Sequence, residues 1–260
     1  MSTSSIYPND AAASALYFDS VEPMGDGVTS AYGFSALSES DDLADANSVM
    51  AKDHPVVLTF ADNVSADTRQ AMMTSTMFSQ MMADRGANKE VEAIKWHKIY
   101  SEAMFNCGWF MTDNDRSRID TSDRKVTMDA LVLEIVASVA GGNAAALLPL
   151  LTSTLGKIKD SKPLLTLFEN NSKDNDRCKV TLMPCLESKA GIPVTVFAGI
   201  DCHFSRDQGG SWFWAWDLAS MEVTKVATLV NFNASHYKQY ETTILKKLGG
   251  NSQSYFDLID

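Results

Sequence analysis

The sequence predicts an α+β fold in which a helical layer packs against a C-terminal antiparallel sheet of four to five strands, followed by a closing helix. Helical periodicity and an almost uncharged stretch occupy the middle of the chain, whereas runs rich in Val, Thr, Phe and Trp dominate after residue 163. Of the 260 residues, 45% are hydrophobic, so the chain is long and apolar enough to bury a sizeable core.

The same pattern divides the chain into three regions. Residues 1–53 form an N-terminal arm that we expect to be ordered against the body, residues 54–162 are mainly helical, and residues 163–260 form the antiparallel β part with its C-terminal helix. A single domain over residues 1–260 stays open, because the sheet needs an apolar layer and the helices could supply it.

The arm is rich in Ser, Ala and Asp, and its apolar residues are spaced singly. We expect these residues to be anchors that pin an irregular segment onto the body. The arm could instead lie on a neighbouring subunit, which would make the protein a homo-oligomer. The anchor residues are Ile6, Leu16, Phe18, Val21, Tyr32, Phe34 and Leu37.

One strand and two amphipathic helices open the helical region. The run VVLTF, residues 56–60, has strand composition, Ser65 is a candidate N-cap for a helix over residues 65–84, and a second helix covers residues 89–110. Methionines recur along the first helix near helical spacing, which predicts either a core of flexible side chains or an adaptable surface for a partner or lipid. The residues concerned are Met72, Met73, Met77, Phe78, Met81 and Met82.

The most distinctive stretch is DALVLEIVASVAGGNAAALLPLL, residues 129–151, in which Asp129 and Glu134 are the only charged side chains. Two Gly residues interrupt it, so we expect two antiparallel helices, with Gly141 left-handed at the end of the first and Asn143 as N-cap of the second. Such a hairpin is either the helical centre of a core or a segment that can enter a bilayer. We expect it to be buried before any membrane contact.

Five strand-like runs follow the hairpin, separated by residues typical of turns. Their spacing predicts an antiparallel meander, and a helix from about residue 235 to 248 closes the chain before Gly249-Gly250. The runs cover residues 164–168, 179–186, 192–204, 211–218 and 223–232.

Charge and missing motifs exclude several functions. Asp and Glu outnumber Lys and Arg by 33 to 22, which gives a net charge of −11 and argues against nucleic acid and against simple electrostatic attachment to anionic lipid. The sequence contains no phosphate-binding loop, dinucleotide fingerprint, HExxH or GxSxG motif. The four cysteines are not spaced as zinc ligands. We therefore lean toward a protein that is not an enzyme and has no metal or cofactor.

The N-terminus lacks the charged and apolar regions of a Sec signal peptide, and four cysteines are too few for a secreted disulfide scaffold. We expect synthesis in a reducing cytoplasm. Export by a route that needs no cleaved signal stays open.

Cys202 is the residue to which we assign any chemistry. Strand alternation places it on an apolar face with Val196 and Ile200, so its thiol is either a small buried hydrophobe or faces a pocket for a fatty acyl chain, bound beside the sulfur or esterified to it. His203 falls on the other face with Asp201 and Ser205. That row cannot converge as a catalytic triad does, so a solvated sheet face is the simpler interpretation.

Tryptophans alternate in SWFWAWDL, residues 211–218. If this run is a strand, Trp212, Trp214 and Trp216 project from one face. They then form either a ladder within the core or an exposed platform for sugars or for the membrane interface.

Three functions are open. The first is a non-enzymatic, membrane- or lipid-engaging protein of the effector, toxin or virulence-factor type, which the apolar hairpin, the methionine-rich helix and the Trp run favour. The second is a self-assembling or partner-binding structural protein, which the arm favours. The third is an acyl-binding or S-acylated protein, or an enzyme, that uses Cys202. We place the first ahead.

Overall fold

The structure, a computed structural model, describes residues 11–23, 34–37, 47–51, 54–89, 91–111, 117–119, 127–174, 176–204, 212–214 and 221–249. Within these residues, nine strands form one mixed sheet with the order β1-β2-β3-β7-β8-β9-β4, while β5 pairs with β9 and β6 with β7. The strands are β1 (Phe34–Ala36), β2 (Ser48–Ala51), β3 (Val56–Phe60), β4 (Trp109–Met111), β5 (Ser117–Ile119), β6 (Lys173–Asp174), β7 (Arg177–Glu187), β8 (Pro193–Phe204) and β9 (Met221–Phe232).

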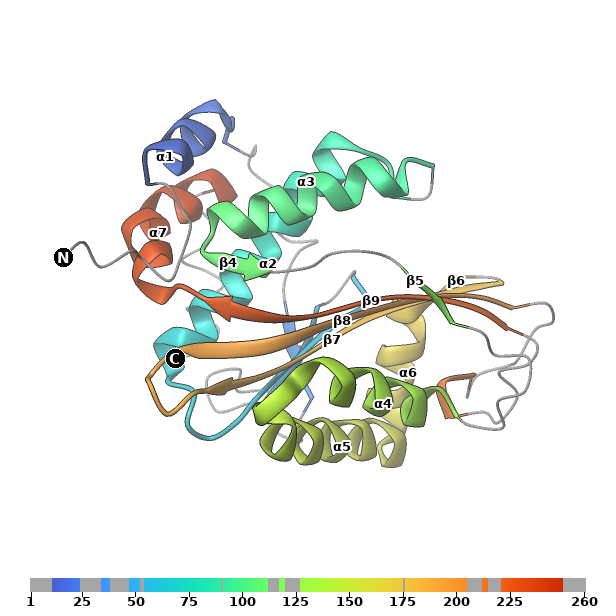
Figure 1. The fold of residues 1–260 in the computed structure, drawn as a ribbon. Coiled ribbons are helices and arrows are strands. Elements are labelled where there is room, and N and C mark those ends of the chain that lie inside the picture. The colour runs from blue at the N-terminus through green and yellow to red at the C-terminus, as the bar shows by residue number, and fades with distance from the viewer. Residues whose placement is uncertain are drawn as a thin grey trace.

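Helices cover both faces of the sheet (Figure 1). One layer contains α2 (Ala66–Gly86), α3 (Ala93–Asn106) and α7 (Ala234–Leu248), with α1 (Ala11–Ser20) outside it against α7. The other layer contains α4 (Met128–Ala140), α5 (Ala144–Asp160) and α6 (Lys162–Ser172).

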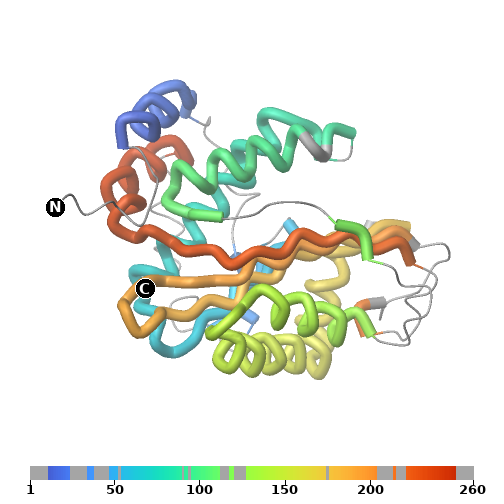
Figure 2. The backbone as a smooth tube through the Cα atoms, viewed as in Figure 1, coloured from blue at the N-terminus to red at the C-terminus, as the bar shows by residue number. Residues whose placement is uncertain are grey.

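Three long strands, β7, β8 and β9, run side by side along the molecule (Figure 2). They separate two apolar cores. Alternation sorts their side chains: Val196, Ala198 and Ile200 of β8 pack toward α4 and α5, whereas Phe197 packs toward α2 and α3. The hairpin face is apolar along all three strands, whereas on the other face the buried apolar residues of these strands are Met183, Cys185, Phe197, Val226, Val230 and Phe232.

The α+β class is confirmed, but the sheet is larger than expected and mixed. β3 joins it and pairs in parallel with β7, with Val56 opposite Thr181 and Phe60 opposite Cys185. A parallel pair needs a crossover, and here it is formed by the whole segment from α2 to α6. Strand composition identified β3, but composition carries no information about so distant a partner.

The predicted N-cap of the helix over residues 65–84 is confirmed, and the closing helix has a cap of its own. Ser65 caps α2, because its Oγ accepts a hydrogen bond from the Thr68 backbone N–H at 3.2 Å. Asn233 caps α7 in the same way, accepting from His236 N at 3.0 Å. Met72, Met77 and Met81 are buried, so the core interpretation of the methionine stripe is the correct one.

One predicted strand is wrong: residues 164–168 lie in the helix α6 rather than in the sheet. Pro163 stands in the first turn of this helix, where its missing N–H costs nothing. Leu164, Leu167 and Phe168 have helical spacing, and Phe168 is fully buried. A five-residue apolar run is too short for its period to distinguish the two structures.

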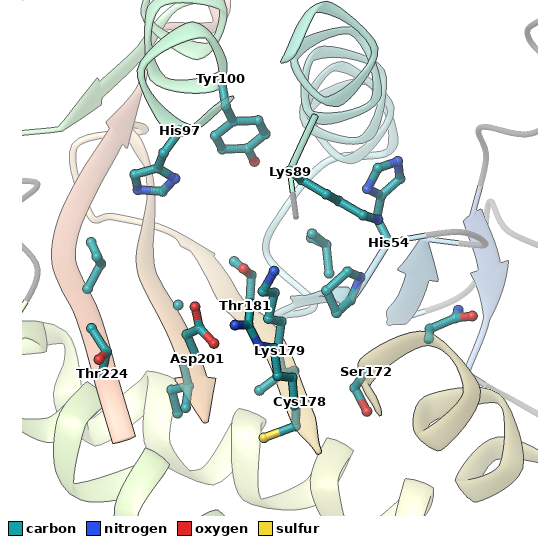
Figure 3. Close-up of a pocket in the computed structure, with 18 of the residues that line it drawn as sticks. His54, Lys89, His97, Tyr100, Ser172, Cys178, Lys179, Thr181, Asp201 and Thr224 are labelled. Carbon is teal, nitrogen blue, oxygen red and sulfur yellow. The ribbon is translucent and has the colours of Figure 1, made fainter. Parts of the chain in front are cut away.

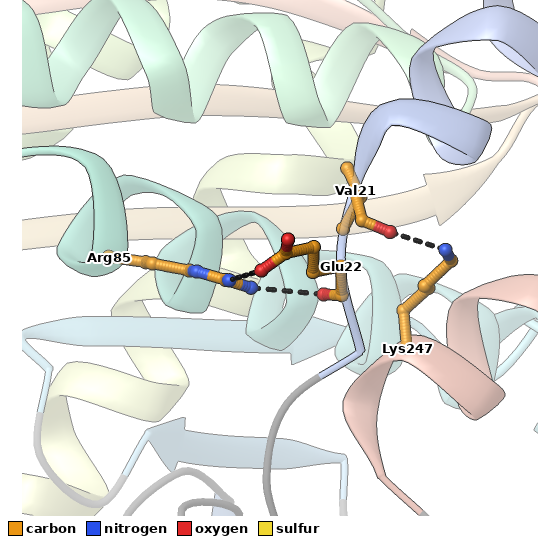
Figure 4. A network of polar contacts seen from close by, with 4 residues as sticks. All are labelled: Val21, Glu22, Arg85 and Lys247. Atoms are coloured by element: carbon orange, nitrogen blue, oxygen red, sulfur yellow. Dashed lines mark hydrogen bonds and ion pairs between the residues drawn. The ribbon is translucent and has the colours of Figure 1, made fainter.

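The described part of the N-terminal arm is anchored to its own chain. Phe18 is 1% exposed and its ring lies 5.9 Å from that of Phe78 and 4.9 Å from that of Tyr240. Beyond α1, Arg85 Nη2 contacts Glu22 Oε2 at 2.8 Å and Arg85 Nη1 donates to the Glu22 carbonyl at 3.0 Å (Figure 4). The Lys247 ammonium donates to the Val21 carbonyl beside them (Figure 4).

Some of the other residues expected to be anchors are buried and one is exposed. Val21, Phe34 and Leu37 are buried, whereas Leu16 is 72% exposed; Ile6 and Tyr32 lie outside the described residues. Homo-oligomer formation through the arm stays a prediction.

Candidate functional site

The predicted pair of antiparallel helices is confirmed as α4 and α5, which lie side by side on the outer surface of the sheet (Figure 1). Gly141 ends α4 with a φ of 54°, a conformation that favours glycine, and a short 3₁₀ turn, Gly141–Asn143, follows. Asn143 holds the N-cap position of α5 but makes no side-chain cap hydrogen bond.

Only the inner side of this hairpin is buried. Its large apolar side chains pack onto β7, β8 and β9 beneath it, which explains why the sequence there is so hydrophobic. The buried residues are Met128, Leu131, Val132, Ile135, Val136, Ala140, Leu147, Leu151, Thr154, Leu155 and Ile158.

The outer side of the hairpin is uncharged on both sides of its turn, between the exposed charged residues Glu134 of α4 and Lys157 of α5. From Ile135 to Gly156, 22 consecutive residues contain no ionisable side chain, and Glu134 just before them is exposed. Segment Met128–Asp160 has a mean hydropathy of 1.8, and among the described residues it is the one stretch long and apolar enough to cross a membrane, although only 33% of its most apolar part is buried. The exposed residues are Ala137, Ser138, Gly141, Gly142, Ala145, Ala146, Pro149, Thr152 and Ser153.

A small polar cluster interrupts the apolar contact between the hairpin and the sheet. Thr154 Oγ1 on α5 lies 2.9 Å from Ser48 Oγ on β2 and accepts a hydrogen bond from Thr59 Oγ1 on β3 at 3.2 Å. All three hydroxyls are buried. Water could replace these bonds on separation, so they fix the position of α5 without adding much to its attachment.

Cys202 lies beneath the hairpin, as strand alternation predicted. It is 1% exposed, belongs to the core under α4 and α5, and stands directly opposite Cys178 on β7. Burial, together with a hydrogen bond to Cys202, raises the pKa of Cys178. Both sulfurs are buried and shielded from polar reagents. Acylation of Cys202 stays a prediction.

His203 lies on the other face of β8, exposed, with its Nε2 3.4 Å from Asp176 Oδ2. Ser205, the third member of the row expected on this face, lies outside the described residues. The pair is a solvated contact, as the simpler interpretation predicted.

The Trp run is not a strand where the structure describes it. Trp212–Trp214 forms a 3₁₀ turn, and Trp216 and the side chain of Trp212 lie outside the described part. Phe213 is fully buried and Trp214 partly so, and both rings pack on Phe168 of α6. A 3₁₀ turn cannot project alternate residues from one face, so the strand predicted over residues 211–218 is wrong at residues 212–214.

A cavity of about 360 Å³ lies on the opposite face of the sheet, between α3 and the strands (Figure 3). β7, β8 and β9 form its floor, and His54 and the C-terminal end of α6 contribute to its side. Its volume is within the range of ~300–1,000 Å³ that is typical of small-molecule sites.

Aromatic rings form the wall of this cavity. Trp96 and Tyr100 on α3 stack with their centroids 5.2 Å apart, and Tyr100 lies 6.3 Å from Phe197 on β8. Asp84 on α2 braces the wall, because it accepts a hydrogen bond from Trp96 Nε1 at 2.6 Å and lies 3.1 Å from His54 Nε2. The wall is therefore held in place by the protein itself.

The floor carries polar groups in register. Lys179, Asp201 and Thr224 are aligned across the three strands, and Thr181 and Gly199 form the next row. In the sequence this signal is the row of Asp201 and His203 on β8, for which a solvated sheet face is the simpler interpretation. The aromatic wall, which comes from a distant helix, could not be foreseen.

The described residues contain no group of three or more His, Cys, Asp or Glu arranged to hold a metal ion. The thiols of Cys107 and Cys185 are also buried, and burial raises the pKa of Cys185 to about 12 and that of Cys107 further. These two thiols are therefore poor nucleophiles at neutral pH.

No protein-family model and no curated protein sequence matches the chain. A solved structure titled delta-endotoxin is similar with a TM-score of 0.42 and 9% identity, over 69% of this chain and 81% of that chain. A second, titled "Structure of the Evf virulence factor", has a TM-score of 0.43 and 11% identity, over 93% of this chain and 89% of that chain. At these scores the likeness concerns general arrangement, and no activity follows from it.

Proposed function

We propose that this acidic protein engages lipid membranes through the α4–α5 hairpin, as a non-enzymatic effector or toxin. The observation that carries the proposal is the run of residues 135–156, in which neither the buried nor the exposed residues bear an ionisable group, on a chain with 55 acidic and basic residues in all. Helices at a protein surface normally carry charged residues on the solvent side. An uncharged outer side removes the main energetic barrier to contact with hydrocarbon.

The closed hairpin exposes mostly Ala, Gly, Ser and Thr, which offer little apolar area to a bilayer. Its large side chains, such as Leu147 and Leu151, face the sheet. Membrane binding would therefore require the hairpin to leave the sheet, so that these leucines contact lipid instead.

Helix length sets how the released hairpin would lie. α4 has 13 residues and α5 has 17. At about 1.5 Å per residue they reach roughly 20 and 26 Å, short of the ~30 Å hydrocarbon core. The pair would enter one leaflet as a hairpin, or cross as a single helix if the turn at Gly141 straightens.

Vesicle flotation tests the proposal. We expect the protein to float with neutral phosphatidylcholine vesicles at least as well as with vesicles containing phosphatidylserine, because the net charge of −11 opposes anionic lipid. Absence from both floating fractions at neutral and acidic pH would contradict membrane engagement and would favour the assembly function.

A reversible lock tests whether the hairpin must open. Ser48→Cys with Thr154→Cys would join β2 to α5 at a point where the native oxygens are 2.9 Å apart. The oxidised variant should lose flotation and regain it after reduction, while wild type treated with the same oxidant keeps it. Undiminished flotation of the locked form would show that the hairpin does not move.

Two added charges test the surface itself. Ala145→Glu with Ala146→Glu places carboxylates on the exposed first turn of α5, where the helix dipole tolerates them. We expect flotation to fall strongly with no loss of thermal stability. The matched control, Gln239→Glu with Thr242→Glu, adds the same charge at exposed positions of α7 and should float as wild type does.

A further inference from the structure

The cavity under α3 differs in charge from the rest of the protein. Within the part of the chain that the structure describes, its lining includes five basic residues and a single acidic one, Asp201, although acidic residues outnumber basic ones in the sequence by 33 to 22. Figure 3 shows the amino groups of Lys89 and Lys179 directed into the cavity. Strand alternation puts Arg177, two residues before Lys179, on the same face.

A buried hydroxyl also points into this space. Tyr100 is 3% exposed, and its Oη has no hydrogen-bond partner within the described structure. Figure 3 shows this hydroxyl directed into the cavity, above Thr181 and Asp201. Burial raises the pKa of Tyr100, so the group is a neutral donor at physiological pH. A buried hydroxyl without a partner costs stability, and a bound ligand would supply the missing partner.

Gly199 keeps the floor open. It lies in the middle of β8 between Thr181 and Val226, where an added Cβ would be 3.4 Å from Phe197 Cε1 and would meet no backbone atom nearby. Its φ lies outside the left-handed region. Neither the backbone nor packing therefore requires glycine here, and glycine inside a strand often marks a close approach by a ligand.

We propose that this cavity binds a small organic anion whose planar ring system lies against Trp96, Tyr100 and Phe197. Lys89 and Lys179 would hold its anionic group, and Tyr100 Oη would donate to or accept from a polar atom of the ring. Asp201, beside Lys179, would accept from a hydroxyl or amine of the ligand and disfavour a second anionic group. The aromatic wall of the site comes from α3 and Phe197, on the face of the sheet opposite the hairpin, so the proposal does not rest on membrane binding.

Two fluorescent probes that share one ring system test both parts of the site. 8-Anilinonaphthalene-1-sulfonate carries an anionic group, and N-phenyl-1-naphthylamine is its uncharged counterpart. Titration of the native protein should show saturable binding of both. The double variant Lys89→Met with Lys179→Met should lower the affinity for the anionic probe at least ~10-fold and that for the neutral probe less than ~2-fold. Only the anion makes charge-assisted hydrogen bonds with the lysines.

The matched control is Lys98→Met with Lys246→Met, which removes the same charge from exposed positions outside the cavity and should leave both affinities unchanged. Gly199→Leu, which fills the floor, should abolish binding of both probes while far-UV circular dichroism stays native. If that variant does not fold, Gly199→Ala should still weaken both probes. The proposal would be overturned if the cavity variant and the control variant bound the anionic probe equally well. It would also be overturned if a folded Gly199 variant bound both probes as wild type does.

Tyr100→Phe gives a readout that does not depend on a probe. Removal of a buried hydroxyl without a partner should raise Tm by a few degrees, whereas removal of a bonded one lowers it. A lowered Tm would mean that the hydroxyl is already occupied by the protein, and its role toward a ligand would be refuted.

Discussion

The helix buried on every side in this protein is not among its most apolar helices. In α2, every residue from Thr74 to Met81 is buried, although five of these eight are Ser, Thr or Gln. The α4–α5 hairpin is far more hydrophobic, yet only 33% of its most apolar part is buried. How deeply a helix is buried therefore depends on how many neighbouring elements pack around it rather than on its hydrophobicity. The apolar hairpin packs against the sheet through one side only.

Two buried serines of α2 donate hydrogen bonds to the backbone of their own helix. Ser75 Oγ donates to the Ala71 carbonyl at 2.7 Å and accepts from Trp109 Nε1 at 2.7 Å. Ser79 Oγ donates to the Ser75 carbonyl at 2.8 Å. Because these side chains are short and bonded, α3 and α7 can pack closely against α2. That layer is held by specific bonds as well as by apolar contact, whereas the hairpin depends almost entirely on the latter.

The largest effect should come from the inner side of the hairpin. Leu147→Asp would bury an unpaired carboxylate at a position that is 0% exposed, and we expect a loss of about 4 kcal/mol in the free energy of unfolding. Ala146→Asp, one residue away and exposed, should change it by less than about 0.5 kcal/mol. Urea denaturation measures both. Similar values for the two variants would show that α5 does not pack through one side.

Hydrogen exchange compares the two layers directly. We expect backbone amides of α4 and α5 to exchange at least about tenfold faster than those of α2, because the hairpin can open without unfolding the other core. Exchange with mass spectrometry at neutral pH measures this difference. If α2 exchanges first, the proposed opening of the hairpin loses its basis.

A pH effect should arise in the α2–α7 layer. His236 is 5% exposed, and its Nε2–H donates to the Asn106 carbonyl at 2.9 Å. Burial lowers the pKa of His236, so the unfolded chain binds a proton more readily than the folded one. The contribution of neutral His236 to the free energy of unfolding is complete above the unfolded pKa of about 6.5 and is lost as pH falls below that value.

We therefore expect thermal stability to fall between pH 7.5 and 5, with part of the fall due to this histidine. His236→Gln, which keeps a donor but does not titrate, should lose that part. The same pH dependence in wild type and variant would assign the effect to other groups.

The last prediction concerns acylation of Cys202, from which we expect the smallest effect on stability. An acyl chain on this sulfur would lie in the core under the hairpin and not in the α2–α7 layer. A C16 chain held there would bury apolar surface worth ~0.8 kcal/mol per CH₂, enough to persist through purification. Intact-protein mass spectrometry before and after neutral hydroxylamine decides the matter, since hydroxylamine cleaves thioesters. The mass of the bare polypeptide in both samples would make Cys202 a core residue only.

Sequence reasoning was most successful where local pattern and burial agree. The alternation of Val196, Ile200 and Cys202 against Asp201 sorted the two faces of β8 correctly, and the Gly-Gly break located the turn of the hairpin. It failed for residues 164–168, where five apolar residues fit either period, and for the tryptophans near residue 212, where alternation in the sequence did not mean a strand.

The sequence alone determined the fold class, the hairpin, the long strands and the net charge, because each depends on neighbouring residues or on composition. Tertiary structure decided which helix is central, the parallel pairing of β3 with β7, and the cavity where Lys89 and Tyr100 meet Lys179. The strand pairing and the cavity bring together residues about 80 or more positions apart in the chain. Local periodicity shows which side of an element is apolar, but it does not show which distant element will pack against that side. The two sites we propose differ in the same way: the hairpin was visible in the sequence, and the cavity exists only in the fold.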